Sequence, residues 1–184
     1  IESIFQEGAG GSSLFSFQNV SKATAFGFEI EGRKKLNKRF TLQANGSYIN
    51  SKIDDAALNI SRSLQGQSPY IVNTGLLYDV VEKGFNATVL FNQVGKRIYL
   101  VGDAFGAGAP DVFENPRALV DFQVSKKFSN NKAEIKFTIS DLLNQRQIFY
   151  QNNNSNTDYD KNNDATRFSR KFGTTYGVTL NYSL

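Results

Sequence analysis

The sequence predicts an all-β protein, an antiparallel up-and-down transmembrane β-barrel. Three observations lead to this prediction. Apolar and polar residues alternate with a period of two along most of the chain, short turns alternate with long loops, and aromatic residues gather at one end of the expected strands. The composition agrees, because 16 Phe, eight Tyr, 15 Gly and only three Pro are typical of strands and turns.

Length and composition restrict the possible functions. A chain of 184 residues predicts one domain, 1–184. The mean hydropathy of −0.39 and apolar runs of only four or five residues exclude a spanning helix, which needs ~18 apolar residues. The absence of Cys and His removes disulfides, thiol chemistry and every Ser-His or Cys-His mechanism, so we expect no enzyme, no cofactor and no metal site. A net charge of +4 without a basic run among stacking aromatics argues against nucleic acid.

The alternation predicts eight strands if the first, short one is counted. In 40–50, for example, Phe40, Leu42 and Tyr48 share one face, while Thr41 and Gln43 lie on the other. The expected strands are 1–6, 24–36, 40–50, 70–80, 85–101, 117–128, 133–151 and 167–184.

The connections between these strands are of two kinds. Three are tight turns, at 37–39, 81–84 and 129–132, and four are long segments rich in Gly, Asn, Asp and Ser, at 8–21, 54–68, 102–116 and 152–165. Short and long connections alternate strictly, so an up-and-down meander places all the tight turns at one end and all the long loops at the other. Basic residues crowd the short-turn end, and acidic residues prefer the long loops.

A soluble barrel has its apolar face inside, and a membrane barrel has it outside. The sequence favours the membrane. The polar face is mostly Thr, Ser, Asn, Gln and Gly rather than Lys and Glu, and the strands are long for a soluble protein. The apolar-face aromatics near the short turns also lie at matching depths, as they do at a lipid–water boundary; they are Phe40, Tyr78, Phe85, Phe128 and Tyr182.

Several stretches, in their order and spacing, resemble the TonB-dependent receptors of Gram-negative outer membranes: ATAFGFEIEGRKKL, SLQGQSPYIVNTGLLYD, FNQVGKRIYLVG, PRALVDFQVSKKF, FTISDLLNQ and YGVTLNYSL. The resemblance implies that the chain forms the C-terminal eight strands or so of a barrel of about 22 strands. It further implies that a plug domain and the segment that binds TonB lie outside this chain. The parent receptor would then take up a scarce nutrient, such as an iron chelate, cobalamin, an oligosaccharide or a peptide.

The last strand resembles the signal that the barrel-assembly machinery of such membranes recognises, in Thr175, Gly177, Leu180 and Tyr182. By the same resemblance, the C-terminus faces the periplasm. The expected partners are outer-membrane lipid, the remaining strands and plug of the parent receptor, the assembly machinery and, through the N-terminal part, TonB. Long-loop tips hold substrate in this family, which makes Phe105, Asp111, Asn154 and Tyr159 candidate ligand contacts.

Three other functions remain open on the residues alone. A self-contained eight-stranded outer-membrane barrel with a structural or adhesive role fits the strand count, provided that 1–6 is a complete strand that pairs with the last one. An outer-membrane lipid-modifying hydrolase has a suitable size, but it usually needs a Ser-His pair. A soluble ligand-binding barrel is disfavoured by the depths of the aromatic residues.

Overall fold

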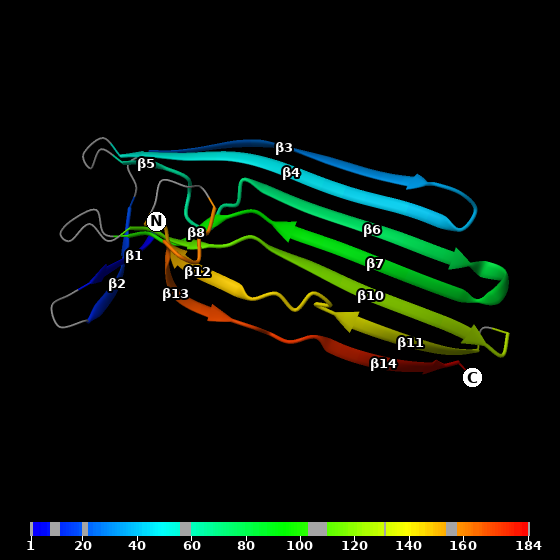
Figure 1. The fold of residues 1–184 in the computed structure, drawn as a ribbon. Coiled ribbons are helices and arrows are strands. Elements are labelled where there is room, and N and C mark those ends of the chain that lie inside the picture. Colours follow the sequence, from blue (N-terminus) through cyan, green and yellow to red (C-terminus); the bar gives the residue numbers. More distant parts are fainter. Residues whose placement is uncertain are drawn as a thin grey trace.

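The computed structural model describes residues 2–7, 12–19, 22–55, 60–102, 110–130, 132–153 and 158–183. These residues form antiparallel β-strands joined by turns and loops, and their one helical element is the 3-10 turn η2 (Val81–Lys83). Figure 1 shows the strands lying side by side in one long, open sheet, with smaller sheets at one end.

Eight strands form the main sheet. Seven of them lie in the order β14-β11-β10-β7-β6-β4-β3, and the short β5 pairs with β4. Their bounds are β3 (Lys22–Lys35), β4 (Phe40–Asp55), β5 (Ile60–Arg62), β6 (Tyr70–Val80), β7 (Phe85–Val94), β10 (Arg117–Phe128), β11 (Ala133–Ser140) and β14 (Thr175–Tyr182). Every pairing is antiparallel, and β3 and β14 form the two edges. The antiparallel up-and-down architecture is therefore confirmed, although the sheet is not closed into a barrel.

Two smaller sheets accompany the main sheet. The four-stranded sheet has the order β13-β12-β9-β8, and β1 pairs with β2. Their bounds are β1 (Glu2–Glu7), β2 (Ser13–Gln18), β8 (Arg97–Leu100), β9 (Val112–Glu114), β12 (Gln147–Gln151) and β13 (Ala165–Arg170). The strands β8, β9, β12 and β13 each adjoin a main-sheet strand in the chain, so four strands of the main sheet continue into this second sheet.

The tight turns lie together at one end of the sheet, with the C-terminus, and the long connections lie at the other end (Figure 1). We call these the hairpin end and the loop end. At the β3–β4 turn, the side chain of Asn37 accepts hydrogen bonds from the backbone N–H groups of Arg39 (2.8 Å) and Phe40 (2.9 Å). Gly84 closes the β6–β7 turn with a φ of +56°, a conformation that favours glycine. The predicted separation of short turns from long loops is thus confirmed.

The register gives the main sheet two chemically different faces, as the alternation predicts. Directly opposite residues share a face, and the pairs Phe28–Tyr48, Leu42–Leu76 and Phe122–Ile139 define the apolar face. The pairs Asn45–Asn73 and Gln123–Thr138 define the polar face.

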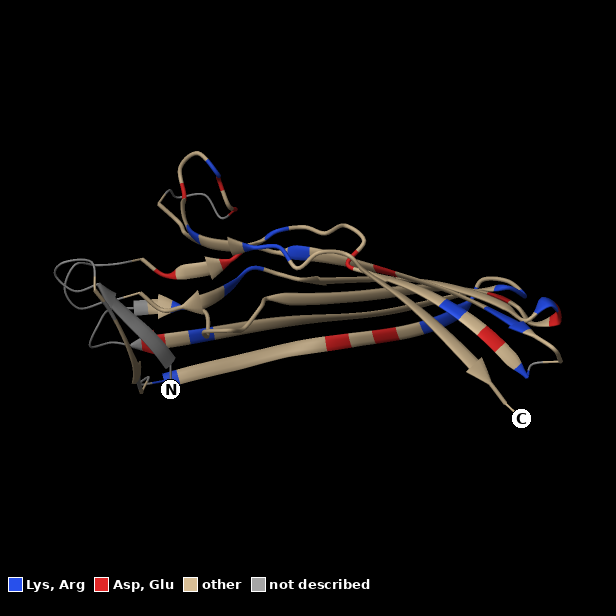
Figure 2. Ribbon diagram, turned by 90° about the horizontal axis from the view of Figure 1, so that it is seen from below, with Lys and Arg blue, Asp and Glu red and all other residues tan. Residues whose placement is uncertain are grey.

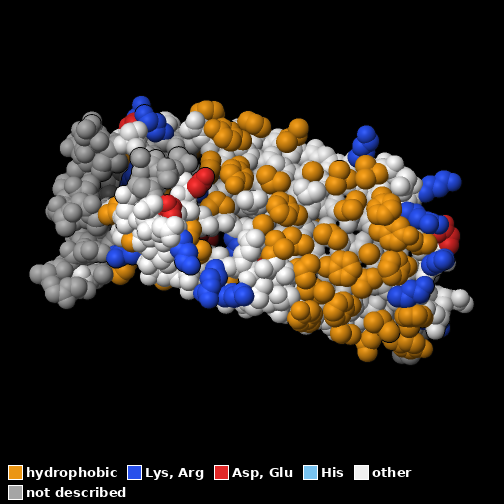
Figure 3. Space-filling view, viewed as in Figure 1, with side chains coloured by type: hydrophobic (Ala, Val, Ile, Leu, Met, Phe, Trp, Pro, Cys, Tyr) orange, Lys and Arg blue, Asp and Glu red, His pale blue; other side chains and the backbone are white. Residues whose placement is uncertain are grey.

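The apolar face of the main sheet is exposed. Phe26 and Phe28 on β3 keep 70% and 67% of their surface accessible, and Leu180 on β14 keeps 72%. Figure 3 shows hydrophobic side chains spread over the main sheet from its middle to the hairpin end. The buried apolar cluster lies at the loop end instead, where Val112 and Phe149 pack with Leu100. The main sheet therefore leaves its hydrophobic face uncovered, as expected for a face that contacts lipid in a membrane barrel.

Two belts of aromatic residues border this apolar face. At the hairpin end, the rings of Phe40 and Tyr78 lie 4.7 Å apart, and Tyr78 lies 6.1 Å from Phe85. Towards the loop end, Tyr48 lies opposite Tyr70 on the same two strands. Eight residues separate the belts, or roughly 27 Å along a strand and about 20 Å of depth for a tilted one. This spacing is comparable with the apolar band of a membrane barrel.

Some boundaries differ from the sequence prediction. The expected loops 8–21, 54–68 and 102–116 contain the short strands β2, β5 and β9. The expected single strands 85–101, 133–151 and 167–184 are each interrupted, at 95–96, 141–146 and 171–174. Positive φ angles at Asp141 (52°) and Gly173 (88°) lie in two of these interruptions and turn the chain out of the strand conformation.

Candidate functional site

A row of polar side chains crosses the polar face of the main sheet, from β3 to β7. Asn45 donates a hydrogen bond to Glu29, Asn73 donates to Asn45 (3.2 Å), and Asn92 donates to Asn73 (2.6 Å). Each residue comes from a different strand, and the register places Asn45 opposite Asn73 and Asn73 opposite Asn92. We call these four residues the amide ladder. Its carboxamides form hydrogen bonds with one another, so the backbone N–H and C=O groups remain available for pairing between the strands.

A hollow of about 450 Å³ lies beside the amide ladder. Its lining combines charges of both signs, from Glu31, Arg33 and Asp121, with the amide of Gln43. Small residues such as Gly75 leave room for the hollow, because they place no side chain in it. An added Cβ on Gly75 would lie 2.9 Å from the side-chain nitrogen of Gln43 and 3.1 Å from Leu90. A wall of this chemistry accommodates water and polar solutes.

A second polar row lies at the loop end, across β8, β9, β12 and β13. Arg97 Nε forms an ion pair with Glu114 (2.7 Å), and Gln147 donates a hydrogen bond to the same carboxylate. Arg170 Nε in turn donates to the side-chain oxygen of Gln147 (2.6 Å). A hollow of about 190 Å³ is lined by Arg97, Glu114 and Gln147 together with residues of the polar face, so this row continues that face.

Aromatic rings stand beside the second row. Phe149 is buried between Phe168, whose ring stacks on it at 4.2 Å, and Tyr99 at 4.5 Å. The guanidinium of Arg170 lies over the rings of Phe149 (5.6 Å) and Phe172 (5.1 Å). Phe149 itself is buried, but Tyr99, Phe168 and Phe172 keep 41–60% of their surface exposed, so these outer rings can stack on the flat part of a solute next to guanidinium and amide groups.

The turn after β11 joins three strands on the polar face. The carboxylate of Asp141 forms an ion pair with the guanidinium of Arg117 on β10 (2.8 Å). The backbone N–H of Asp141 donates a hydrogen bond to the carboxylate of Asp121 (2.9 Å). Thr174, just before β14, donates to the carbonyl of Asp141 (3.0 Å). Arg117 and Asp141 keep only 17% and 12% of their side-chain surface exposed, so the pair is largely shielded from water.

The structure does not show a common site for the four candidate ligand contacts, Phe105, Asp111, Asn154 and Tyr159. Phe105 and Asn154 lie outside the described residues. Asp111 accepts a hydrogen bond from the backbone N–H of Gly102 (2.8 Å) and so helps to close the base of its loop. Tyr159 packs its ring 4.9 Å from Tyr150 and places its hydroxyl 2.8 Å from that of Thr166. Their role as ligand contacts stays a prediction.

The segment 158–164 folds around two carboxylates. Asp164 accepts hydrogen bonds from the backbone N–H groups of Asp160 (2.8 Å) and Asn153 (3.1 Å). Asp160 accepts from the N–H of Asn162 (2.9 Å) and from the amide of Asn163 (2.5 Å). These hydrogen bonds, that of Asn162 first, lower the pKa of the Asp160 carboxyl below its usual value.

The assembly-signal residues all lie on the edge strand β14. Thr175 and Gly177 face the polar side, opposite Ser140 and Thr138, whereas Leu180 and Tyr182 face the apolar side and are 72% and 70% exposed. A Cβ on Gly177 would lie 2.6 Å from Thr138 Oγ1, so glycine allows β14 to approach β11. One side of β14 pairs with β11, and the other is an open edge.

The amide ladder and the second polar row were not anticipated from the sequence. Asn45, Asn73 and Asn92 each lie near the middle of a polar-face series, which was the available signal, but their contact depends on the register between strands. Among the described residues, no three His, Cys, Asp or Glu side chains are grouped so that they could hold a metal ion. No helix in the described part of the chain is long and apolar enough to cross a membrane.

The comparisons with known proteins agree with this geometry. The family model described as "Outer membrane protein beta-barrel family" matches residues 1–182. No curated protein and no solved structure matched the chain. In such barrels the apolar face contacts lipid and the polar face lines the interior, which is the division seen in the main sheet. The chain therefore belongs to the outer membrane protein β-barrel family, and its location is the outer membrane of a Gram-negative bacterium.

Proposed function

We propose that this chain is part of the barrel of a TonB-dependent receptor that takes up a scarce nutrient with energy relayed from the inner membrane. The observation that carries the proposal is the direction of the two edge strands. Six antiparallel pairings connect β14 to β3, so these two edges run the same way. An antiparallel barrel can therefore close only if an odd number of further strands lies between them.

A receptor barrel of about 22 strands meets this condition, because the seven strands of the main path leave about 15 to be supplied. The long edge β3 also supports the proposal. It spans 14 residues, and its apolar side chains Phe26, Phe28 and Ile30 are 67–70% exposed. In lipid, an edge of this length leaves backbone N–H and C=O groups unpaired unless another strand pairs with it. The sequence resemblance to these receptors adds the substrate range, which comprises an iron chelate, cobalamin, an oligosaccharide or a peptide.

The alternative is a self-contained eight-stranded barrel with a structural or adhesive role. A single additional strand is also an odd number and would also allow β14 and β3 to be joined, which favours this alternative. That strand would have to come from the start of the chain, where Glu2–Glu7 instead pairs with Ser13–Gln18. A scan of cysteine pairs, one on β1 and one on β14, separates the two proposals in the folded protein. The small barrel predicts a disulfide for the pairs that lie opposite each other in its closing register, and the receptor predicts none for any pair.

In the proposed receptor the hairpin end and the C-terminus face the periplasm, and β14 carries the signal to the assembly machinery. Ligand contacts would come from the loop end and the polar face, and TonB would act through a part of the protein outside this chain. The proposed role is transport, not catalysis. Robust labelling of the folded protein by a serine-reactive probe would contradict this assignment.

Uptake by whole cells tests the transport proposal. Deletion of the gene should abolish growth at limiting concentrations of one nutrient from a panel of ferric chelates, cobalamin, oligosaccharides and peptides. Disruption of TonB should have the same effect on that nutrient, because the resemblance implies energy-coupled uptake. Unchanged growth of the deletion strain across the panel, with the protein verified as expressed in the parent strain, would exclude a nutrient receptor.

A further inference from the structure

Charge is distributed unequally between the two faces at the hairpin end. Lys34 and Lys126 lie on the apolar face, where the alternation otherwise places apolar residues, opposite Leu42 and Phe85 respectively. By register, the described acidic side chains of the main-sheet strands from the loop-end belt to the hairpin turns lie on the polar face; they are Glu29, Glu31, Asp79, Asp121 and Glu134. The lipid-facing surface near the hairpin end is thus positive. Figure 2 shows Lys and Arg at the hairpin turns, with further basic residues towards the loop end.

Lys126 shows how a cation is held on this surface. Its ammonium group donates a hydrogen bond to the carbonyl of Lys83 in the β6–β7 turn and lies 6.0 Å from the ring centroid of Phe128. The side chain therefore carries its charge away from the apolar band towards the turn, while its methylene groups stay beside the aromatic belt.

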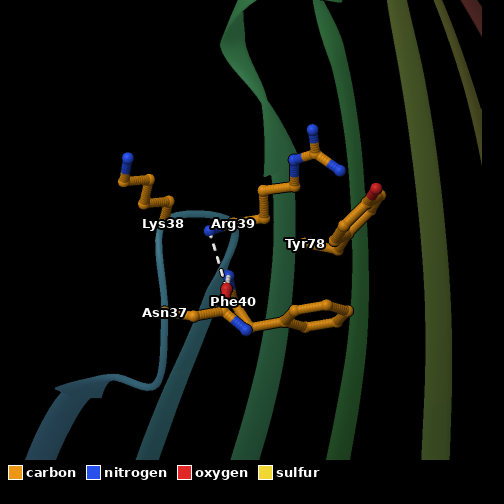
Figure 4. Close-up of a pocket in the computed structure, with 5 residues that line it drawn as sticks. All are labelled: Asn37, Lys38, Arg39, Phe40 and Tyr78. Carbon is orange, nitrogen blue, oxygen red and sulfur yellow. Dashed lines mark hydrogen bonds between the residues drawn. The ribbon is translucent and has the colours of Figure 1, made fainter.

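A hollow of about 580 Å³ lies at the β3–β4 turn, on the same belt (Figure 4). It is lined by Asn37, Lys38, Arg39, Phe40 and Tyr78. The rings of Phe40 and Tyr78 form its apolar side. Arg39 extends beside Tyr78, and Lys38 points from the turn to the side away from the rings (Figure 4). No described carboxylate forms an ion pair with either cation. The two hydrogen bonds to the Asn37 side chain fix the turn, so the cations start from a rigid backbone.

We propose that this hollow binds the phosphate of an anionic phospholipid of the periplasmic leaflet. Arg39 offers a planar fork of N–H donors that fits two phosphate oxygens, and Lys38 adds a point charge. Phe40 and Tyr78 hold the glycerol and upper acyl region at the depth of the belt. Lys126 on β10 marks a second contact of the same kind, two strands away from Tyr78 on β6. The inference goes beyond nutrient uptake and does not depend on it, although the choice of leaflet rests on the proposed orientation.

Lipid selection by the full-length protein tests this inference. The protein is placed in nanodiscs that contain equal amounts of phosphatidylglycerol and phosphatidylcholine, and the lipids that remain bound after detergent release are weighed by native mass spectrometry. Wild type should retain phosphatidylglycerol in excess. The double variant Lys38→Gln/Arg39→Gln should reduce the retained ratio at least about fivefold, because each basic group near a charged surface contributes about one factor of this size. Both leaflets have the same composition, so the result is independent of orientation.

The matched control is Lys96→Gln/Lys161→Gln, which removes the same charge at the loop end and should leave the ratio unchanged. Only folded protein is compared, as shown by heat-modifiable migration, and Lys126→Gln provides a second variant with an intact β3–β4 turn. An equal ratio in wild type, an unchanged ratio in the hairpin-end variant, or an equal loss in the control would each overturn the proposal. So would complete displacement by soluble glycerol 3-phosphate, which would identify a site for a free phosphate instead of a lipid.

Discussion

Gly177 on β14 lies directly opposite Thr138 on β11, and a Cβ at Gly177 would come within 2.6 Å of Thr138 Oγ1. Glycine at this position of the predicted assembly signal therefore has a packing role within the sheet. We expect Gly177→Ala to destabilise the pairing of β14 with β11 by about 1–3 kcal/mol, as overpacking does. The measurement is the folded fraction of the full-length protein after refolding into detergent in vitro, where no assembly machinery is present.

The double variant Gly177→Ala/Thr138→Ala separates packing from recognition. Removal of Thr138 Oγ1 should restore refolding in vitro, because the clash has gone. If the assembly machinery also reads Gly177, the double variant will still be depleted from the outer membrane in cells. Failure of the double variant to refold in vitro would show that the contact with Thr138 is not the reason for glycine at this position.

The two faces of β10 should respond oppositely to charge. Phe122 lies on the apolar face, and its neighbour Gln123 lies on the polar face. We expect Phe122→Arg to lower the free energy of unfolding in lipid vesicles by about 2–4 kcal/mol, because the guanidinium would lie in the hydrocarbon region. Gln123→Arg introduces the same charge one residue away and should change it by less than about 1 kcal/mol. Equal losses in the two variants would contradict the assignment of the faces.

The amide ladder should contribute to the stability of the sheet. Asn73 donates to Asn45 and accepts from Asn92, so Asn73→Leu removes both hydrogen bonds and leaves their partners unsatisfied. We expect a loss of about 1–3 kcal/mol in urea unfolding followed by circular dichroism. Asn50→Leu, on the exposed apolar face of β4, is the control and should be close to neutral. A neutral Asn73→Leu variant would mean that water replaces the ladder without cost.

Arg117 and Asp141 should be energetically coupled. Their ion pair is 2.8 Å long and mostly shielded from water, so Arg117→Met leaves the Asp141 carboxylate without its cation. Asp141→Asn removes the charge but keeps a residue that tolerates the φ of 52°. We expect the double variant to be about 1–3 kcal/mol more stable than the sum of the two single changes predicts. Strict additivity in unfolding experiments would show that the pair is not coupled.

Segment 158–164 should lose its internal hydrogen bonds in acid. The pKa of Asp160 is lowered from the usual 3.8, so its carboxylate stabilises the folded segment at higher pH. That stabilisation should disappear as the pH falls below 3.8 towards the lowered pKa, which NMR shifts of the Asn162 and Asn163 amides would report. Asp160→Asn should abolish this pH dependence. A midpoint above 3.8 would contradict the role of these hydrogen bonds.

The sequence by itself determined the fold class, the two faces and the placement of the turns. Alternating series such as Phe26, Phe28 and Ile30 indicate a strand, because a period of two places every second side chain on the same face of a sheet. Short turn segments, such as 81–84 with Gly84 at its end, likewise indicate where the chain reverses direction. The family match and the exposed apolar face agree with these predictions.

The tertiary structure decided what the alternation leaves undetermined. Contact between Asn45, Asn73 and Asn92 depends on the register of three strands, and a slip of one residue would move each of them to the opposite face. The interruption at Asp141 depends on Arg117, Asp121 and Thr174, which lie 20 or more residues away in the chain. The common direction of β3 and β14 follows from the number of antiparallel pairings between them, which only the structure shows. Local pattern carries none of this information, because these features arise from hydrogen bonds between residues far apart in the sequence.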